Sequence, residues 1–587
     1  MNIFDERIKK LQEQLIKDGL KAYIIPATDP HLSEMYAPRF GAMRYYFCSF
    51  KGETGTLLVT QTDYYLYTDG RFWTEAENEL KGTSCKLVYA GKANVLSMSD
   101  FIKENNLYPL GLDSSLFSLN EVKGFYVDDN HKIISKSYLS LVEDLPPMPK
   151  DKIFKIDEEL LSTTRYDRVM AIVSEMKKQN AKACLLTALD DIAYVIGYRG
   201  NDIAYTPVFY SYLYINEDGV SDLFIDEEKI PNSFNSLKVN IHKYEDLIKF
   251  LDERKDVPTM IDLSNTNALI CSHLKNIINA TSPASIFKAI KGKVEVENIK
   301  RIHKLDGIAV LKLQKYIEDN IDKGLDELKC AEFIDNTRLK MDECFELSFE
   351  TIAAVDSNAA MMHYAPSENS NAKLYKDSKL LLVDSGGQYY GGTTDITRTF
   401  LIKPTKEVIK DYTLTLKSQI ALSKTVFEKG CSGLSLDIIA REVFWKEGMD
   451  YKCGTGHGVG YISCVHEGPV SFRYYVPAGR KVSGILTPGH IITVEPGVYK
   501  AGKYGIRLEN ELLVVDGLTT DDGIFYKFET VTYCPYDRKG IDVSLLDDEE
   551  LKWLNDYLGL VYDTLAPLID DEELLAYLRK QCAPFLR

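Results

Sequence analysis

Residues 380–399 read LLLVDSGGQYYGGTTDITRT and carry the most informative pattern in this chain of 587 residues. The apolar run 380–383 predicts a buried strand that ends at Asp384. Glycines then predict a turn, and Asp395 follows eleven positions after Asp384. This distance fits a hairpin that brings the two carboxylates together. An aspartate before a glycine turn can also be a plain strand terminator, so the pair needs further support.

Three more side chains with metal-binding chemistry follow further along the chain. His457 lies within GTGHGVG, where small neighbours let a ligand or metal approach the backbone closely. Glu495 directly follows the apolar run 491–494, a position where an unpaired carboxylate is costly to bury. Glu509 lies within GIRLEN. These positions make all three residues candidate metal ligands.

Arg507 and Glu509 share one face of a predicted strand, because alternate side chains of a strand point the same way. Two interpretations fit this pair. It is either an Arg–Glu pair on a solvated strand, or Glu509 is a metal ligand and Arg507 orients it.

The five candidates share one property, a surplus of negative charge. They are Asp384, Asp395, His457, Glu495 and Glu509. Four carboxylates in one site repel each other unless cations compensate, and two divalent ions supply about that charge. Oxygen-rich coordination with a single imidazole favours Mn²⁺, Co²⁺ or Fe²⁺ over a thiolate zinc site. Such ion pairs hold a bridging hydroxide, so the set predicts metal-assisted hydrolysis.

The composition limits the classes of function. Apolar residues make up 45% and charged residues 27%, which is typical of a globular protein. The net charge of -17 argues against a nucleic-acid partner. No apolar run approaches the ~18 residues of a membrane span, and the N-terminus lacks the apolar core of a secretory signal. The 11 cysteines include no CxxC pair and suit a reducing cytoplasm.

The chain contains an internal repeat. KAYIIPATD at residues 21–29 returns as KACLLTALD at residues 182–190, and both follow an amphipathic helix. Two copies of one α/β unit explain this better than chance similarity. A proline-rich break at residues 146–149 ends the first copy, and the segment after about residue 288 has an α+β pattern. We expect four segments, at residues 1–155, 156–288, 289–540 and 541–587.

Several stretches resemble the pita-bread metallopeptidases, and among them the long, three-domain form of aminopeptidase P (Xaa-Pro aminopeptidase). In the third segment these are VDSGGQYYGGTTDITRTF, GTGHGVGYISCVHEGP, TVEPGVY and GIRLENELLVV. In the first two segments they are DPHLSEMYAPR, YTDGRFW and TALDDIAYVIGYRGNDIAYTPVFYSY, and in the tail they are FETVTYCPYDRKGID and LKWLNDY. The resemblance implies two creatinase-N-like α/β domains, a pita-bread catalytic domain and a short helical extension.

The resemblance also implies a role for each metal ligand. Asp384 would bind one ion, and Asp395 and Glu509 would bridge both. His457 and Glu495 would bind the other ion, and Glu495 would also take a proton from the bridging water. The expected cofactor is a pair of divalent ions, with Mn²⁺ first and Co²⁺, Fe²⁺ or Zn²⁺ as alternatives.

Four further residues gain a meaning from the resemblance. His363, in MMHYAP, and His466, in VHEGP, match the family's substrate-contacting pair, which suits an amide hydrolase. Arg199 matches a motif that would gate the substrate. Cys453 stands where the family often has a histidine, and it is either a small half-buried residue or a substrate-side group. The other histidines lie outside a glycine-rich stretch such as that around His457 and are expected to be structural or surface residues: His31, His131, His242, His273, His303 and His490.

The implied function is a cytoplasmic aminopeptidase that removes the N-terminal residue from peptides with proline at position 2. One alternative is prolidase, which has the same ligands and cuts dipeptides. Another is a non-enzymatic pita-bread binding module, although such a module has no need for four repelling carboxylates.

The tail predicts two helices and a contact surface. Asp547 and Asp570 are the expected N-caps, each with a glutamate three residues later, at Glu550 and Glu573. The first tail helix carries an apolar set: Trp553, Leu554, Tyr557, Leu558 and Val561. We interpret this set as a homodimer contact, which the family resemblance also implies. Packing of the helix on its own domain is the alternative.

Overall fold

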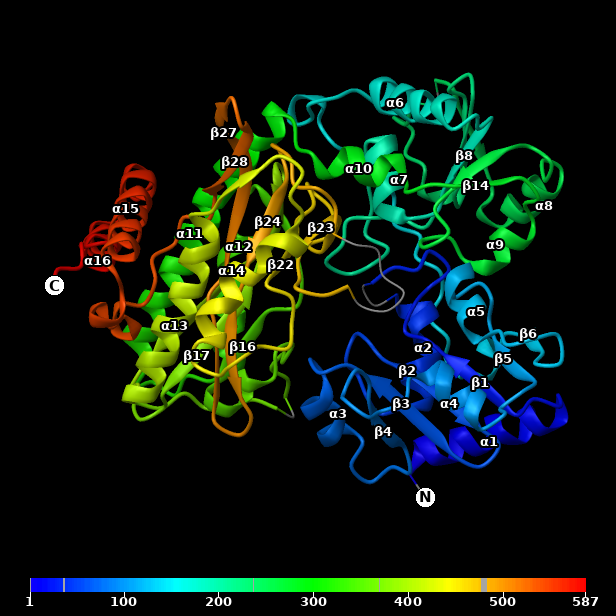
Figure 1. Cartoon of the computed structure of the whole chain (residues 1–587), viewed down its shortest axis with the longest axis horizontal. Coiled ribbons are helices and arrows are strands. Elements are labelled where there is room, and N and C mark those ends of the chain that lie inside the picture. Colours follow the sequence, from blue (N-terminus) through cyan, green and yellow to red (C-terminus); the bar gives the residue numbers. More distant parts are fainter. Residues whose placement is uncertain (1, 35–36, 236, 369, 477–482) are drawn as a thin grey trace. The chain divides into compact units, whose positions relative to one another are not determined.

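The chain forms two compact units (Figure 1). The computed structural model describes residues 2–34, 37–235, 237–368, 370–476 and 483–587. The first unit consists of Met1–Ile156 and Thr163–Ser285, and the second of Asp157–Ser162 and Ile286–Arg587. The four segment boundaries expected from the sequence stay predictions.

A six-stranded sheet forms the centre of the first half of the first unit, with strand order β4-β3-β2-β1-β5-β6. The strands are β1 (Ala22–Ile25), β2 (Thr56–Thr60), β3 (Tyr64–Thr68), β4 (Lys86–Tyr89), β5 (Leu110–Leu112) and β6 (Ile133–Ser135). The helices are α1 (Ile3–Lys17), α2 (Pro38–Phe47), α3 (Trp73–Glu79), α4 (Met98–Glu104) and α5 (Leu119–Phe125). Strand β1 pairs antiparallel with β2 and parallel with β5.

A second six-stranded sheet repeats this plan in the order β12-β11-β10-β8-β13-β14. The strands are β8 (Ala183–Leu186), β10 (Tyr212–Asn216), β11 (Ser221–Phe224), β12 (Val239–His242), β13 (Thr259–Ile261) and β14 (Ile277–Asn279), with β7 (Phe154–Lys155) and β9 (Tyr198–Arg199) as a separate pair. The helices are α6 (Arg165–Lys178), α7 (Leu189–Ile196), α8 (Leu247–Asp252) and α9 (Ala268–Ser272). Helix α10 (Pro283–Ala289) begins in the first unit and continues into the second, which resumes at Ile286. Strand β8 pairs antiparallel with β10 and parallel with β13. The predicted repeat is confirmed, because β1 and β8 occupy the same place in both sheets.

Both copies begin with a capped amphipathic helix. In α1 the Asn2 side chain accepts the N–H of Phe4, and an apolar stripe that includes Ile8 and Leu11 is buried. In α6 the side chains of Thr164 and Asp167 form a capping box. Each helix leads into the central strand of its sheet, as the repeated sequence predicts.

The second unit combines long helices with several antiparallel sheets. Its main sheets are β16-β17-β20 and β21-β28-β27-β24-β22-β23, with the smaller sheets β15-β18-β19 and β25-β26. The strands are β15 (Cys344–Leu347), β16 (Ile352–Val355), β17 (Leu380–Ser385), β18 (Gly387–Tyr389), β19 (Gly392–Thr393), β20 (Ile396–Leu401), β21 (Val426–Glu428), β22 (Gly456–Gly458), β23 (Glu467–Phe472), β24 (Ile491–Val494), β25 (Gly497–Lys500), β26 (Tyr504–Arg507), β27 (Asn510–Thr520) and β28 (Gly523–Thr530). The helices are α11 (Lys293–Asn320), α12 (Glu327–Leu339), α13 (Lys406–Ser423), α14 (Gly433–Trp445), α15 (Asp548–Leu565) and α16 (Glu572–Gln581).

The hairpin predicted around the two aspartates is confirmed. Strands β17 and β20 pair antiparallel, with Asp384 opposite Thr397, and Asp395 directly precedes β20. Between them, β18 and β19 form a smaller hairpin that pairs with β15. The hairpin therefore brings both carboxylates to the same end of the sheet.

The tail helices begin with acidic caps, one of them shifted by a residue. Asp547 and Glu550 form the expected capping box of α15. Helix α16 is capped by Asp571, whose side chain accepts the N–H of Leu574, so the expectation of Asp570 is wrong. Two adjacent aspartates offer the same cap chemistry, and the sequence does not distinguish them.

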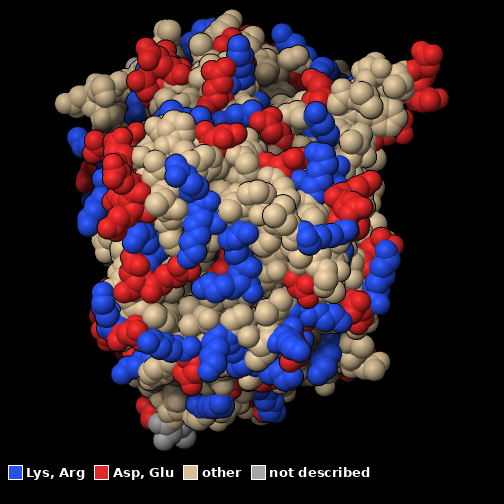
Figure 2. All heavy atoms as spheres, turned by 90° about the vertical axis from the view of Figure 1, so that its left-hand side faces the viewer, with Lys and Arg blue, Asp and Glu red and all other residues tan. Residues whose placement is uncertain are grey.

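The apolar set on α15 packs inside its own unit. Leu554, Tyr557, Leu558 and Val561 belong to a core cluster with residues of α11 and α13, and Trp553 stacks on the ring of Tyr557. Its interpretation as a homodimer contact is therefore wrong, because these side chains are covered already. Figure 2 looks onto the side of the molecule that bears α15 and α16, and charges of both signs are spread among uncharged residues there. Among the described helices, none combines the length and apolar character needed to cross a membrane.

Candidate metal centre

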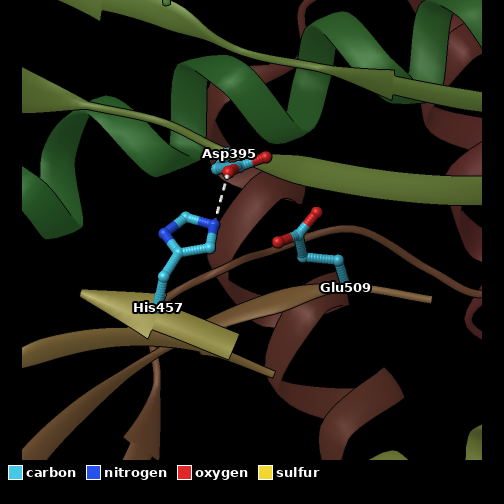
Figure 3. Close-up of side chains that lie close together, drawn as sticks. All are labelled: Asp395, His457 and Glu509. Carbon is cyan, nitrogen blue, oxygen red and sulfur yellow. Dashed lines mark ion pairs between the residues drawn. The ribbon is translucent and has the colours of Figure 1, made fainter. Parts of the chain in front are cut away.

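Three of the predicted ligands meet in the second unit (Figure 3). Asp395 lies just before β20, His457 on β22 and Glu509 between β26 and β27. One ligand atom from each lies within 4.8 Å of the others. The Nε2 atom of His457 is 3.3 Å from Oδ2 of Asp395. Three separate segments of the chain, between residues 395 and 509, thus supply one group of side chains.

Glu495 extends this group. It directly follows β24, where its N–H donates to the carbonyl of Thr455 at 2.7 Å. Its Oε1 atom is 3.7 Å from Nε2 of His457, and the side chain is half-buried. This carboxylate is therefore close to the imidazole and still reachable by solvent.

Asp384 joins the site through Arg507. The Nη2 atom of Arg507 is 2.5 Å from Oδ2 of Asp384. Arg507 reaches Glu509 only indirectly, because its Nε donates to the Thr397 hydroxyl at 3.1 Å and that hydroxyl donates to Glu509 Oε2 at 2.8 Å. Arg507 and Glu509 are 3% and 1% exposed, so the interpretation as a solvated pair is wrong.

Carboxylates outnumber cations in this group. Burial raises the pKa values of Asp395 and Glu509 well above their usual range, and the neighbouring carboxylates of Asp384 and Glu495 raise them further. Oδ1 of Asp384 and Oε1 of Glu509 are buried without a hydrogen-bond partner among the described residues. Oxygen atoms in this state fit divalent cations as partners.

Sequence reasoning missed a fifth carboxylate beside these residues. Glu511 on β27 is fully buried, and its Oε1 accepts the N–H of Asp395 at 2.8 Å. The same oxygen is 3.1 Å from Nε2 of His303 on α11. Burial lowers the pKa of His303, but the charges of Glu511 and Asp306 outweigh that effect and raise it overall. The position of Glu511, two residues after Glu509 in a strand, was the available signal.

The two histidines expected to contact substrate are both half-buried in this unit. The ring centroid of His466 is 4.3 Å from that of His457, and the two rings are nearly perpendicular. His363 follows Met362, whose carbonyl accepts from Nη2 of Arg507 at 3.3 Å. His466 is thus beside the group, and the segment of His363 is held by the arginine of the group.

Cys453 lies outside the metal-capable group of the described residues. Its half-buried side chain packs with the apolar cluster that includes Tyr451, Val498 and Tyr499. Its carbonyl accepts from Nη2 of Arg441 at 2.6 Å. These contacts fit the small half-buried residue among the two interpretations, and the role of Cys453 stays a prediction.

Arg199 lies on β9 in the first unit and is 4% exposed. Its Nη1 donates to the carbonyls of Ala193 and Tyr198, at 2.9 and 3.0 Å. The expected role in gating substrate stays a prediction.

Comparison with protein families identifies each part of the chain. The creatinase/prolidase N-terminal domain matches residues 7–125 and again residues 144–295. Metallopeptidase family M24 matches residues 297–516, and the C-terminal region of peptidase M24 matches residues 524–585. The expected fold class is confirmed, with two creatinase-N-like α/β domains followed by a pita-bread domain and a helical extension.

Individual relatives cover nearly the whole chain. The present chain is 33% identical, over 99% of its own length, to the probable Xaa-Pro aminopeptidase P of Laccaria bicolor, and it covers 93% of that protein. It is 32% identical over 99% of its length to Xaa-Pro aminopeptidase 1 of Dictyostelium discoideum, of which it covers 96%. The crystal structure of X-prolyl aminopeptidase from Caenorhabditis elegans, described as a cytosolic enzyme with a di-nuclear active site, matches with a TM-score of 0.93 and 29% identity over 99% of both chains. The chain therefore belongs to metallopeptidase family M24 and, within it, to the three-domain Xaa-Pro aminopeptidases.

Proposed function

We propose that this enzyme is a two-metal aminopeptidase that hydrolyses the N-terminal Xaa-Pro bond of peptides. The observation that carries the proposal is the buried acidic group, in which oxygen atoms of Asp384 and Glu509 have no hydrogen-bond partner among the described residues. Asp395, His457 and Glu509 offer ligand atoms to a common point. The names of the relatives support the specificity for proline at position 2.

The residues that would hold two divalent ions are Asp384, Asp395, His457, Glu495 and Glu509. The family resemblance implies that Asp395 and Glu509 would be shared between the ions, and both side chains are buried in the group. Four carboxylates and one imidazole suit Mn²⁺, and Co²⁺, Fe²⁺ or Zn²⁺ are alternatives. When bound, such ions polarise a carbonyl and lower the pKa of a water molecule.

Other side chains would handle the proton and the substrate. Glu495 is half-buried and close to His457, which suits a group that accepts a proton and passes it to the leaving amine. His363 and His466 would donate hydrogen bonds to the substrate carbonyl as negative charge develops. Arg507 would keep Asp384 in place directly and Glu509 through Thr397. Arg199 is proposed as a substrate-binding residue on the resemblance alone.

The substrate class separates this proposal from prolidase. A bond to proline has no N–H, so peptidases that bind that N–H cannot act on it. An aminopeptidase cleaves Xaa-Pro-Yaa peptides, whereas a prolidase cleaves only Xaa-Pro dipeptides. Measuring hydrolysis of matched Xaa-Pro and Xaa-Pro-Yaa substrates decides between them.

The deciding experiment removes the metal with a chelator and adds Mn²⁺ back. We expect activity on Xaa-Pro-Yaa to vanish and return, and Asp395→Asn to abolish the return. Glu529→Gln is the matched control, because Glu529 is a half-exposed carboxylate paired with Lys300 in the same unit. A protein that takes up no metal and cleaves no peptide would instead be a binding module.

We also propose a homodimer in the cytoplasm. The dimer rests on the family resemblance, since the α15 set no longer supports it. The cytoplasm is supported by the absence of a disulfide among the eleven cysteines, all within the described residues, and by the cytosolic relative. Light scattering at micromolar concentration tests the dimer, and the mass of one chain would overturn it.

A further inference from the structure

A second cluster of buried charges lies close to the proposed metal centre. It consists of Lys288, Lys291 and Glu467, whose side chains are 6%, 2% and 1% exposed. The Nζ atom of Lys291 is 2.6 Å from Glu467 Oε1, and that of Lys288 is 3.3 Å from Glu467 Oε2. We call these three residues the lysine cluster. Both oxygens of its carboxylate therefore have a cation as a partner.

Lys291 holds a segment of chain at both of its ends. Its Nζ also donates to the carbonyl of Val459 at 2.6 Å. Val459 comes directly after β22, which carries His457, and Glu467 opens β23 directly after His466. One ammonium group thus binds the first and last residues of segment 459–467, which contains His466.

The backbone around Lys291 fixes the next strand as well. The N–H of Lys291 donates to the carbonyl of Gly489 at 2.9 Å, and Ile290 forms a β-bridge with His490, directly before β24. A side chain at position 489 would meet the carbonyl oxygen of Lys291 at 2.8 Å, so this close approach needs glycine. Strand β24 ends next to Glu495. The same short stretch therefore contacts segments leading to His457, His466 and Glu495.

A contribution to stability alone does not explain why these three charged side chains are buried together. Buried ion pairs are often no more stabilising than apolar side chains of similar volume. The contacts of the lysine cluster do, however, fix the two ends of one catalytic segment. Fixed geometry is what catalytic groups require, since small displacements are costly to the rate.

We propose that Lys291, together with Lys288, is a positioning residue for His466. By binding Val459 and Glu467, the lysines hold segment 459–467 so that the His466 imidazole stays beside His457. The inference rests on the proposed function, in which His466 contacts the substrate.

The test is a double-mutant cycle between Lys291→Met and His466→Ala in the metal-loaded enzyme. We expect Lys291→Met to keep two metal ions and to lower kcat on Xaa-Pro-Yaa about 100-fold, the cost of a displacement near 1 Å. In the His466→Ala background the same change should cost nothing further, because no imidazole is left to position. Independent, multiplicative losses would overturn the proposal.

Two more variants keep the test informative. Lys288→Met removes the 3.3 Å contact to Glu467 but leaves both contacts of Lys291 in place, so we expect a smaller loss. This variant tests the proposal if Lys291→Met fails to fold. Lys300→Met is the matched control, because Lys300 pairs with Glu529 at 2.6 Å on the surface of the same unit. It should leave kcat within about twofold, as expected for an exposed pair.

Hydrogen exchange measured by mass spectrometry tests the proposal without a substrate. Segment 459–467 should exchange faster in Lys291→Met or Lys288→Met than in Lys300→Met. Unchanged protection would overturn the positioning role whatever the substrate proves to be. Faster exchange with no Xaa-Pro hydrolysis by the unmodified enzyme would overturn only the proposed function.

Discussion

The second unit contains two buried charge clusters of opposite balance. The proposed metal centre has four carboxylates, of which only Asp384 pairs with the guanidinium of Arg507, and two buried oxygens have no partner among the described residues. In the lysine cluster, two ammonium groups face the one carboxylate of Glu467, and both of its oxygens are paired. One residue of each cluster lies on neighbouring strands of one sheet, His457 on β22 and Glu467 on β23.

The difference separates a site that needs a ligand from one that is complete. A buried carboxylate that lacks a partner is costly, so the metal centre is stable only with protons or cations added. The lysine cluster satisfies its carboxylate with the chain's own atoms. Partnering of buried atoms, more than the number of charges, therefore indicates where a ligand binds.

The largest effect should come from breaking the metal centre. Asp395→Ala removes a carboxylate proposed to bind both ions, so we expect loss of metal and a fall in kcat/KM of more than about 10³-fold. Loss of a single donor to the transition state costs on the order of 10²–10³-fold. Metal analysis with steady-state kinetics checks this. A variant that keeps two ions and full activity would refute the assignment.

A pair of isosteric changes should sharpen the contrast in the metal-free protein. Glu467→Gln removes the buried carboxylate charge that pairs with Lys291 and Lys288 and should lower the free energy of unfolding by about 3–5 kcal/mol. Glu509→Gln removes one of several repelling charges and should leave that free energy unchanged or raised. Urea denaturation measures both. Changes of the same sign would contradict the comparison.

The pH dependence of stability should differ between the metal-free and metal-loaded forms. Without metal, the pKa values of Asp395 and Glu509 are raised in the folded state. Between the ordinary carboxyl pKa of about 4 and the raised pKa of the folded state, the folded protein then binds more protons than the unfolded chain, so its stability falls as pH rises through that range. The slope should approach 1.4 kcal/mol per pH unit for each such group.

Bound cations should remove this slope, because they stabilise the charged carboxylates. Melting temperatures measured from about pH 5 to pH 8, with chelator and with Mn²⁺, check the prediction. Parallel curves in the two conditions would show that these carboxylates do not interact with the metal.

The sequence predicted the parts of the site that local patterns carry. Asp384 and Asp395 are joined by one hairpin, and Glu495 directly follows an apolar strand. Their positions in the sequence were therefore enough to mark all three as candidate metal ligands. The duplication of one α/β unit followed from the repeat at residues 21–29 and 182–190. In these cases the pattern of neighbouring residues was enough to predict the local structure.

The sequence alone could not predict contacts between segments that are far apart along the chain. His303 meets Glu511 from a helix more than two hundred residues away, and Lys291 meets Glu467 across a similar gap. Nothing near His303 in sequence distinguishes it from a surface histidine. The interpretation of the apolar set on α15 as a homodimer contact was wrong for a related reason. The sequence shows that a helix face is apolar but does not reveal which surface covers that face.

The smallest effect should come from Cys453, which belongs to neither cluster. Its side chain packs with Tyr451 and Tyr499, and a thiol is a weak hydrogen-bond donor that does not become positively charged. Cys453→Ala should therefore cost under ~1 kcal/mol of transition-state binding, and the acid limb of the pH profile should lack a contribution from this position. His466→Ala should cost on the order of 2.7–4 kcal/mol if the imidazole stabilises the oxyanion. Steady-state kinetics on both variants decides the matter, because equal damage, or loss of metal from Cys453→Ala, would make the cysteine part of the site.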